Sequence, residues 1–449
     1  MPPVTEMVDL RSSFEARLKQ RFEATFSKAG GDEDEMGKMR AKGWQRYLDL
    51  GLPERSLRAR GGGVGYEVHR LRALYELPCT PKLPATFTKE AIAPHLLPES
   101  TGAHIVFANG LFAPHLSDLS ALGPLIASSL SEALLTYGTF LRGRWSRALK
   151  EESDPFAALN AALHDEGLFL YLPPKKALDR PIQILHAIDA SEGSPLISPR
   201  LHLFMGTDSS LNLLSTLHVK GSNPFWMNSL VDITVDERAT LKIATHSDPL
   251  SHGWLLDTVR ASLKRIATFE LVSMDGGAPA LRHDYSVSLM GEGAKAHLSG
   301  ARLLGGSLHS HTEVRIEHIA PGCSSRQHFK AALTGRSKSS FRGMIDVASA
   351  AQQTDAFQLC KTLFLSDEAS CEVRPELRVR ADEVKASHGA TTGELDPELL
   401  FALTARGINP AFAQNLLIGA FVGEIIPKIP SLQCRASALV GSLIEGIDA

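Results

Sequence analysis

The chain of 449 residues has few cysteines, and their arrangement pairs none of them. Cys79, Cys323, Cys360, Cys371 and Cys434 are odd in number, widely scattered and never spaced as CxxC. This pattern argues against a disulfide framework and against a zinc finger. A reducing compartment fits it best.

The sequence also lacks long apolar runs and a strong charge of either sign. No apolar stretch is long enough to cross a bilayer, and residues 1–26 have no uninterrupted apolar core of signal-peptide length. The formal net charge is only -3, which excludes a strongly basic surface for nucleic acid. We therefore expect a cytoplasmic, soluble protein that binds neither membrane nor nucleic acid.

Common catalytic motifs are missing as well. The sequence contains no GxSxG elbow, no HExxH and no Walker lysine. The glycine-rich segment GGGVG at 61–65 is not followed by GK[ST], so it predicts a loop and not a phosphate-binding site. These absences favour a protein that is not an enzyme.

The first part of the chain has helical patterns. Apolar residues recur every three or four positions from Met7 to Phe26, which predicts an amphipathic helix in an N-terminal helical domain over 1–100. From Thr101, HIVFANGLF predicts a strand, a turn and a second strand. A helical insertion follows near 115–165, where Asp154 caps the second helix and Pro155 opens it.

Beyond Gly167 the sequence becomes a long series of short strand-like runs separated by Gly, Asp, Asn or Ser. Such a series is typical of a sandwich, a barrel or a parallel β-helix. The density of turn residues after nearly every run favours the β-helix, which would form a core over 101–393. Because β-helices also occur in secreted polysaccharide-cleaving enzymes, that class is the alternative function. The missing signal peptide and the helical C-terminus argue against it.

The C-terminal domain, 394–449, carries two clear helix starts. Asp396 and Asn409 are N-cap residues, and each is followed by proline at the first helical position. Gly407 is placed to end the first helix. The second helix is apolar around more of its circumference than one core contact requires. Burial within the domain and contact with a partner both remain open for its residues.

The region from Gln352 onward, QQTDAFQ and then PELRVRADEVKASHGATTGELDPELLFALTARGINPAFAQNLLIGAFVGEII, resembles the SufB/SufD family. DPFAALNAALHDEGLFLYLP, RPIQIL and FRGMIDV agree more loosely, and together the matches cover most of 100–430. His388 begins the His-Gly-Ala-Thr of SufD-type members, where SufB-type members have Glu-Ala-Thr after the histidine. Ala386 replaces a cysteine that SufD-type chains often carry, and the first hundred residues match poorly.

The resemblance implies a right-handed parallel β-helix flanked by N-terminal and C-terminal α-helical domains. It also implies a non-catalytic scaffold subunit of the SUF iron–sulfur cluster assembly complex. A SufB-like subunit would pair through the β-helix, and a SufC-like ABC-type ATPase would dock on the C-terminal helices at Phe401, Arg406 and Phe421. The isolated chain would hold no cofactor, and whether it forms a homodimer is left open. Binding of FAD to the assembled complex is left open.

Histidines are the main candidates for chemistry. The resemblance places His388 at the SufB interface as an iron or cluster ligand, and imidazole is a competent ligand for iron. The alternative is that His388 only stabilises the turn before the C-terminal domain. His309 and His311 lie on one face of a predicted strand, with His318 nearby. A metal site is conceivable there, but ordinary hydrogen-bonded histidines are favoured. Cys360 and Cys371 are interpreted as buried apolar residues, with a ligand role as the alternative.

Overall fold

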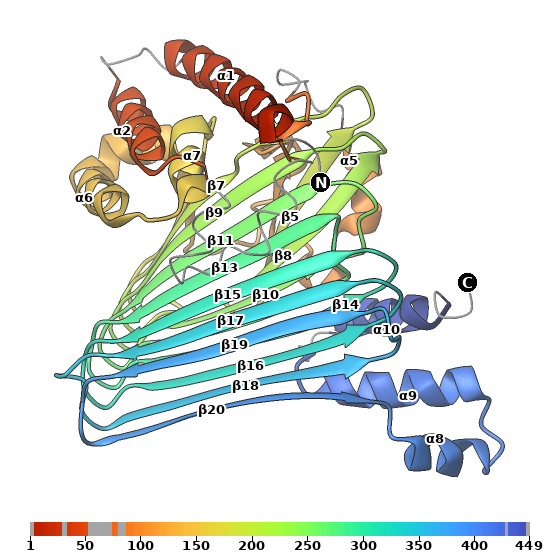
Figure 1. Cartoon of the computed structure of the whole chain (residues 1–449). Coiled ribbons are helices and arrows are strands. Elements are labelled where there is room, and N and C mark those ends of the chain that lie inside the picture. The colour runs from red at the N-terminus through yellow and green to blue at the C-terminus, as the bar shows by residue number, and fades with distance from the viewer. Residues whose placement is uncertain (1–3, 29–33, 53–73, 80–86, 427–429, 446–449) are drawn as a thin grey trace.

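The computed structural model describes residues 4–28, 34–52, 74–79, 87–426 and 430–445 (Figure 1). The glycine-rich segment 61–65, predicted to be a loop, lies outside them. Strands make up 42% of the structure and helices 29%. The chain is mainly β, with a parallel β-solenoid of about eight turns between helical ends, which confirms the predicted fold class.

Two facing sheets form the solenoid, and the chain passes from one sheet to the other at almost every turn. The first sheet has the order β2 (Leu111–Phe112), β1 (His104–Ala108), β5 (Ile182–Ala190), β8 (Ser210–Gly221), β10 (Thr240–Ser247), β12 (Thr268–Asp275), β14 (Lys295–Leu304), β16 (Ser324–Leu333), β18 (Thr354–Phe364), β20 (Val384–Glu394). The second has the order β19 (Ser370–Val379), β17 (Lys338–Val347), β15 (His309–His318), β13 (Ala280–Leu289), β11 (Trp254–Leu263), β9 (Trp226–Val235), β7 (Arg200–Met205), β4 (Leu168–Leu172), β3 (Ile126–Ser129), with β6 (Leu196–Ile197) beside β9.

The solenoid core consists of side chains that stack in register from coil to coil. Leu241 pairs with Phe269, and Phe269 pairs with Ala296, and all three are fully buried. Successive side chains of a strand point to opposite faces, so every second residue faces the interior. This alternation identifies the inward positions of each strand and produces the continuous apolar core.

The predicted strand, turn and strand near residue 104 is confirmed as the antiparallel hairpin of β1 and β2. Asn109 and Gly110 form its turn with φ values of 46° and 81°, as a two-residue hairpin turn of type I′ requires. A side chain at Gly110 would also come within 2.4 Å of Ile197. Glycine is therefore required there for two independent reasons.

Helices cover the first coils of the solenoid (Figure 1). They are α1 (Val4–Lys28), α2 (Glu35–Leu50), α5 (Lys89–Ile92), α6 (Leu130–Glu151) and α7 (Pro155–Leu163). The predicted cap of α7 is confirmed, because Asp154 accepts a hydrogen bond from the backbone N–H of Phe156. Asn160 of α7 donates to the carbonyls of Pro199 and Asn228, which ties this helix directly to the second sheet.

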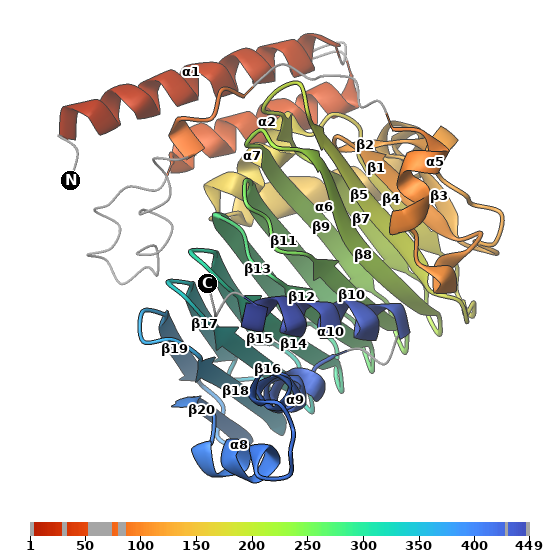
Figure 2. The same ribbon diagram turned by 90° about the vertical axis from the view of Figure 1, so that its right-hand side faces the viewer.

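At the other end of the chain, α8 (Pro397–Thr404), α9 (Pro410–Gly423) and α10 (Pro430–Glu445) follow the last strand. Asp396 and Asn409 cap α8 and α9 as predicted, and Gly407 has a φ of 82° just after α8. Figure 2 shows α9 and α10 against the outer face of the first sheet. Ile418 and Val422 of α9 pack there in one apolar cluster that also contains residues of α10.

Candidate functional site

His388 lies on β20, the last strand of the first sheet. It pairs in register with Gln358 of β18, an inward and fully buried position. By strand alternation, His388 therefore occupies an inward position too. It is nevertheless exposed, because β20 is the last strand of its sheet and no further coil of the described chain covers it. An imidazole side chain is thus placed at the open end of the solenoid interior.

The last coil, formed by β19 and β20, is the open end. In the path of each sheet these strands have only one neighbour, β17 for β19 and β18 for β20. Their side chains are all exposed or half-buried, unlike those of the preceding coils. Val379 on β19 and Phe357 on β18 are large apolar residues exposed here. An edge with unpaired backbone groups and apolar side chains is suited to pairing with another chain.

The two cysteines near this end lie in the solenoid wall. Cys360 on β18 is buried, and Cys371 on β19 is half-buried with its Sγ 3.2 Å from Thr362 Oγ1. Burial raises the pKa of both thiols. A raised pKa keeps a thiol protonated, and only the thiolate is a good metal ligand. The arrangement favours the interpretation of Cys360 as a buried apolar residue, whereas Cys371 is only half-buried.

The histidines of β15 have hydrogen-bonding neighbours inside the protein. His311 Nδ1 lies 2.5 Å from Ser340 Oγ, and His318 Nε2 lies 2.8 Å from Ser325 Oγ. Burial lowers the pKa of His311 to about 3 and that of His318 to about 4. Within the described ranges, no three His, Cys, Asp or Glu side chains are grouped to hold a metal ion. These contacts favour a structural role for both histidines.

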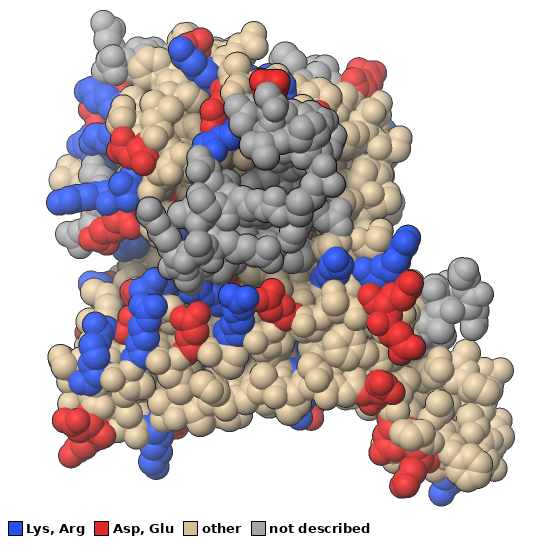
Figure 3. All heavy atoms as spheres, viewed as in Figure 1, with Lys and Arg blue, Asp and Glu red and all other residues tan. Residues whose placement is uncertain are grey.

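A second exposed surface lies on the C-terminal helices. Phe401 of α8 is 72% exposed, and Arg406 just after α8 is exposed while donating to the carbonyl of Ala402. Apolar residues of α8 and α9 are exposed as well. We call Leu399, Phe401, Phe412 and Leu416 the α8–α9 patch. In Figure 3 the lobe of α8 and α9 is largely uncharged, with acidic side chains along its border with the solenoid.

Phe421, the third predicted docking residue, lies on a different part of α9. It is half-buried and packs against the cluster between α9 and the first sheet. The buried ammonium of Lys330 lies 5.0 Å from the centroid of its ring. Lys330 also donates to the carbonyl of Phe421 and, at 2.8 Å, to Glu424. The structure therefore separates Phe421 from Phe401 and Arg406.

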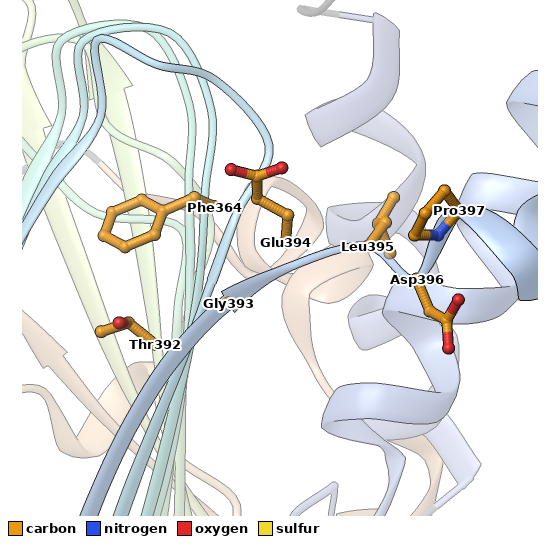
Figure 4. Close-up of a pocket in the computed structure, with 7 residues that line it drawn as sticks. All are labelled: Phe364, Thr392, Gly393, Glu394, Leu395, Asp396 and Pro397. Atoms are coloured by element: carbon orange, nitrogen blue, oxygen red, sulfur yellow. The ribbon is translucent and has the colours of Figure 1, made fainter.

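A groove of about 520 Å³ marks the junction between the last strand and α8. Its lining consists of Phe364, Thr392, Gly393, Glu394, Leu395, Asp396 and Pro397. Figure 4 shows Phe364 and Thr392 on the solenoid side of the groove and Leu395 and Pro397 on the side of the helices. The groove connects the open end with the helices that carry the α8–α9 patch.

Sequence reasoning missed an ionic network inside the middle coils. His283 lies between two carboxylates, 3.2 Å from Asp257 and 3.1 Å from Asp275, and Arg302 lies 2.9 Å from Asp275. Burial alone would raise the pKa of Asp275, but Arg302 and His283 lower it below its usual value. The sequence signals this network only by placing a polar residue, where an apolar one is usual, at an inward position of each strand that contributes to it.

Comparison with known proteins places the whole solenoid in one family. Residues 186–421 match the family model described as the SufBD core domain of the SUF system for FeS cluster assembly, and residues 89–184 match the SufBD N-terminal region.

No helix in the described part of the chain is long and apolar enough to span a membrane.

Individual relatives include both SufB and SufD proteins. An iron–sulfur cluster assembly SufBD family protein of Synechocystis is 27% identical over 349 residues, which cover 76% of this chain and 77% of that protein. SufD of Escherichia coli is 32% identical over 201 residues, 44% of this chain and 47% of its own. SufB of Bacillus subtilis is 23% identical over 321 residues, 70% and 67%. The chain belongs to the SufBD family of the SUF system for iron–sulfur cluster assembly.

Proposed function

We propose that this chain is a SufD-type scaffold subunit that presents the open end of its solenoid to a SufB-like subunit. The single observation that carries the proposal is the exposed last coil, with its unpaired strand edges and with His388 at an inward position. The His-Gly-Ala-Thr sequence at 388–391 supports the SufD type. A polysaccharide-cleaving function has no comparable support, because the family is one of cluster assembly.

Pairing would use the edges of β19 and β20. A strand edge binds an extended partner strand through backbone hydrogen bonds, and the side chains add selectivity. Val379 and Phe357 would then be covered by the partner, which removes exposed apolar surface from water. The same edges would permit a homodimer of the isolated chain, since edge pairing requires only a compatible second strand.

A SufC-like ATPase would dock on the α8–α9 patch. Four large apolar side chains exposed on two short helices mark an interaction surface more than a stable solvent-facing one. Phe401 and Arg406 would contact the ATPase, whereas Phe421 would hold α9 on the solenoid through Lys330. Nucleotide-driven movement of the ATPase would be transmitted from α8 to the last coil through the junction at 392–397.

In this proposal the chain has no turnover of its own. His388 would supply one nitrogen ligand to a nascent cluster formed between this subunit and the SufB-like chain, which would supply the other ligands. Such a cluster is cargo of the complex and not a resident cofactor. The energy for rearrangement would come from the nucleotide on the ATPase.

Co-expression with a SufB-like chain and a SufC-like ATPase tests the proposal. The wild-type chain should co-purify with both, and size determination gives the stoichiometry. The flavin absorbance of the purified complex decides whether FAD binds. Phe401→Asp should release only the ATPase, while Leu135→Asp, the same kind of change at an 89% exposed residue of α6, should retain it. Retention of the ATPase by Phe401→Asp would contradict docking at the patch.

His388→Ala tests the ligand role separately. Because the side chain is exposed, its removal should leave the fold intact, and complex formation should persist while the cluster yield of the reconstituted complex falls. The yield is read from the visible absorbance of the cluster and from bound iron and sulfide. An unchanged yield would show that His388 is not a ligand.

A further inference from the structure

Two glutamines lie in register beneath His388 in the solenoid interior. Gln327 of β16 pairs with Gln358 of β18, and Gln358 pairs with His388 of β20. Towards the first coils the same row continues with Leu298 and Leu271. Polar residues therefore replace leucine only in the last three coils, next to the open end. We call Gln327, Gln358 and His388 the polar column.

Both glutamines are fully buried, and their side-chain amides have no hydrogen-bond partner among the residues that the structure describes. This applies to both Oε1 and Nε2 atoms of each residue. Buried polar groups in native proteins are almost always paired, either with protein atoms or with ordered water. Four unpaired amide atoms in adjacent coils therefore point to a ligand that can both donate and accept hydrogen bonds.

The surroundings of the column accommodate the Gln358 amide and are polar on one side. Gly343 lies opposite Gln358, and a Cβ there would come within 2.5 Å of the Gln358 amide. Glycine thus gives the amide the space that a side chain would occupy. Ser325, the next inward residue before Gln327, is bonded to His318, so the interior remains polar on that side. His388 leaves the other end open to solvent.

We propose that the polar column is a water-binding site in which ordered water molecules bridge the amides of Gln327 and Gln358 to the imidazole of His388. Water bound at one ring nitrogen would select a tautomer and turn the other nitrogen outward, as carboxylate or carbonyl partners do for ligand histidines. Gln358 is then a positioning residue for His388. The use of that orientation in cluster assembly rests on the proposed function, whereas the hydration of the column does not.

Imidazole nitrogen NMR of the isolated, ¹⁵N-labelled chain at alkaline pH tests the positioning role. His388→Ala assigns the signal. In the wild type one tautomer of His388 should dominate, and in Gln358→Met the ratio should shift toward that of a free imidazole. Gln433→Met, the same change at an exposed position of α10, should leave the ratio as it is. An unchanged ratio in Gln358→Met would overturn the proposal.

Thermal unfolding gives an independent test through the sign of the shift in Tm. If water pairs the amides, Gln327→Met removes hydrogen bonds and should lower Tm. If the column is dry, the same substitution removes unpaired buried groups and should raise Tm, which would refute hydration. This measurement remains decisive if Gln358→Met fails to fold.

A crystal structure of the wild-type chain gives the direct view. It should show water within hydrogen-bond distance of both amides, whereas direct contact between the two amides without water would refute the proposal. All three measurements use the isolated chain. Their outcome therefore does not depend on whether the SufB-like chain or the ATPase binds.

Discussion

The two ends of the solenoid are built on opposite principles. At the first coils, helices cover the strands, and Arg200 is buried with hydrogen bonds to Asn160 of α7 and to Asp232 of the neighbouring coil. At the last coil, the side chains of β19 and β20 are exposed or half-buried, and the edges lack a further strand in either sheet path. The same repeating coil is thus sealed at one end and left unsealed at the other.

This difference indicates which end is available for assembly. Burying a charge such as that of Arg200 is costly unless it is fully paired, so the covered end cannot be opened without a large loss. The ion pairs of the last coil, such as Arg342 with Glu376, have at least one partly exposed partner, and covering this end would bury apolar surface. Binding of a partner at the last coil therefore requires the least disruption of the molecule.

The largest expected effect comes from breaking the covered end. Asp232→Ala removes the carboxylate that lies 2.7 Å from Arg200 Nη2 and leaves that buried guanidinium without its counter-ion. We expect a loss of about 3–5 kcal/mol in the free energy of unfolding, measured by chemical denaturation. Asp208→Ala, which breaks an exposed ion pair with Arg238, is the control and should leave stability nearly unchanged. Equal losses of unfolding free energy in Asp232→Ala and Asp208→Ala would refute the contrast between the buried and the exposed ion pair.

The next largest effect concerns the packing of the C-terminal helix α9 against the first sheet. Phe421→Asp places a carboxylate in a half-buried apolar contact beside Lys330 and should destabilise the packing of α9 by about 1–3 kcal/mol. Hydrogen exchange of the α9 amides measures this loss of local stability. Phe401→Asp, at an exposed position of α8, should leave the exchange unchanged. Unaltered exchange in Phe421→Asp would favour a surface role for that ring.

His186, which is half-buried and stacked on Phe107 of β1, makes the stability of the covered coils depend on pH. Burial lowers the pKa of His186 to about 4, below the value near 6.5 of an unfolded histidine. The unfolded chain then binds the extra proton first, so stability is complete above about pH 6.5 and falls as the pH drops toward 4. His186→Gln should flatten this part of the curve of unfolding free energy against pH. An unchanged slope would show that His186 does not contribute.

Local signals in the sequence predicted the individual strands, helix caps and hairpin, whereas the β-helix was favoured by the density of turn residues and implied by the family resemblance. The strand runs, the caps at Asp154, Asp396 and Asn409, and the hairpin near Asn109 all depend on neighbouring residues, and all are present. His388 was selected by resemblance, and its inward position became visible only through the register with Gln358.

Contacts between coils could not be predicted in the same way. Arg200 and Asp232 are 32 residues apart, and the partner of a residue depends on the length of every intervening turn. The same reason hides the polar column, whose members belong to three different coils. For Phe421, the helical pattern alone did not distinguish burial against Lys330 from exposure, because α9 is apolar on most sides.

The smallest effect on stability, and the sharpest test of the open end, comes from Val379→Lys. Val379 is 40% exposed on the edge strand β19, so a lysine there should change the free energy of unfolding by no more than about 0.5 kcal/mol. A charge on a strand edge opposes pairing with another strand, and co-purification with the SufB-like chain should be lost. Ile266→Lys, at a 46% exposed turn residue between β11 and β12, is the matched control and should pair normally. Because neither variant disturbs the core, loss of pairing in both would mean that added charge alone prevents association, and retention in both would place the interface elsewhere.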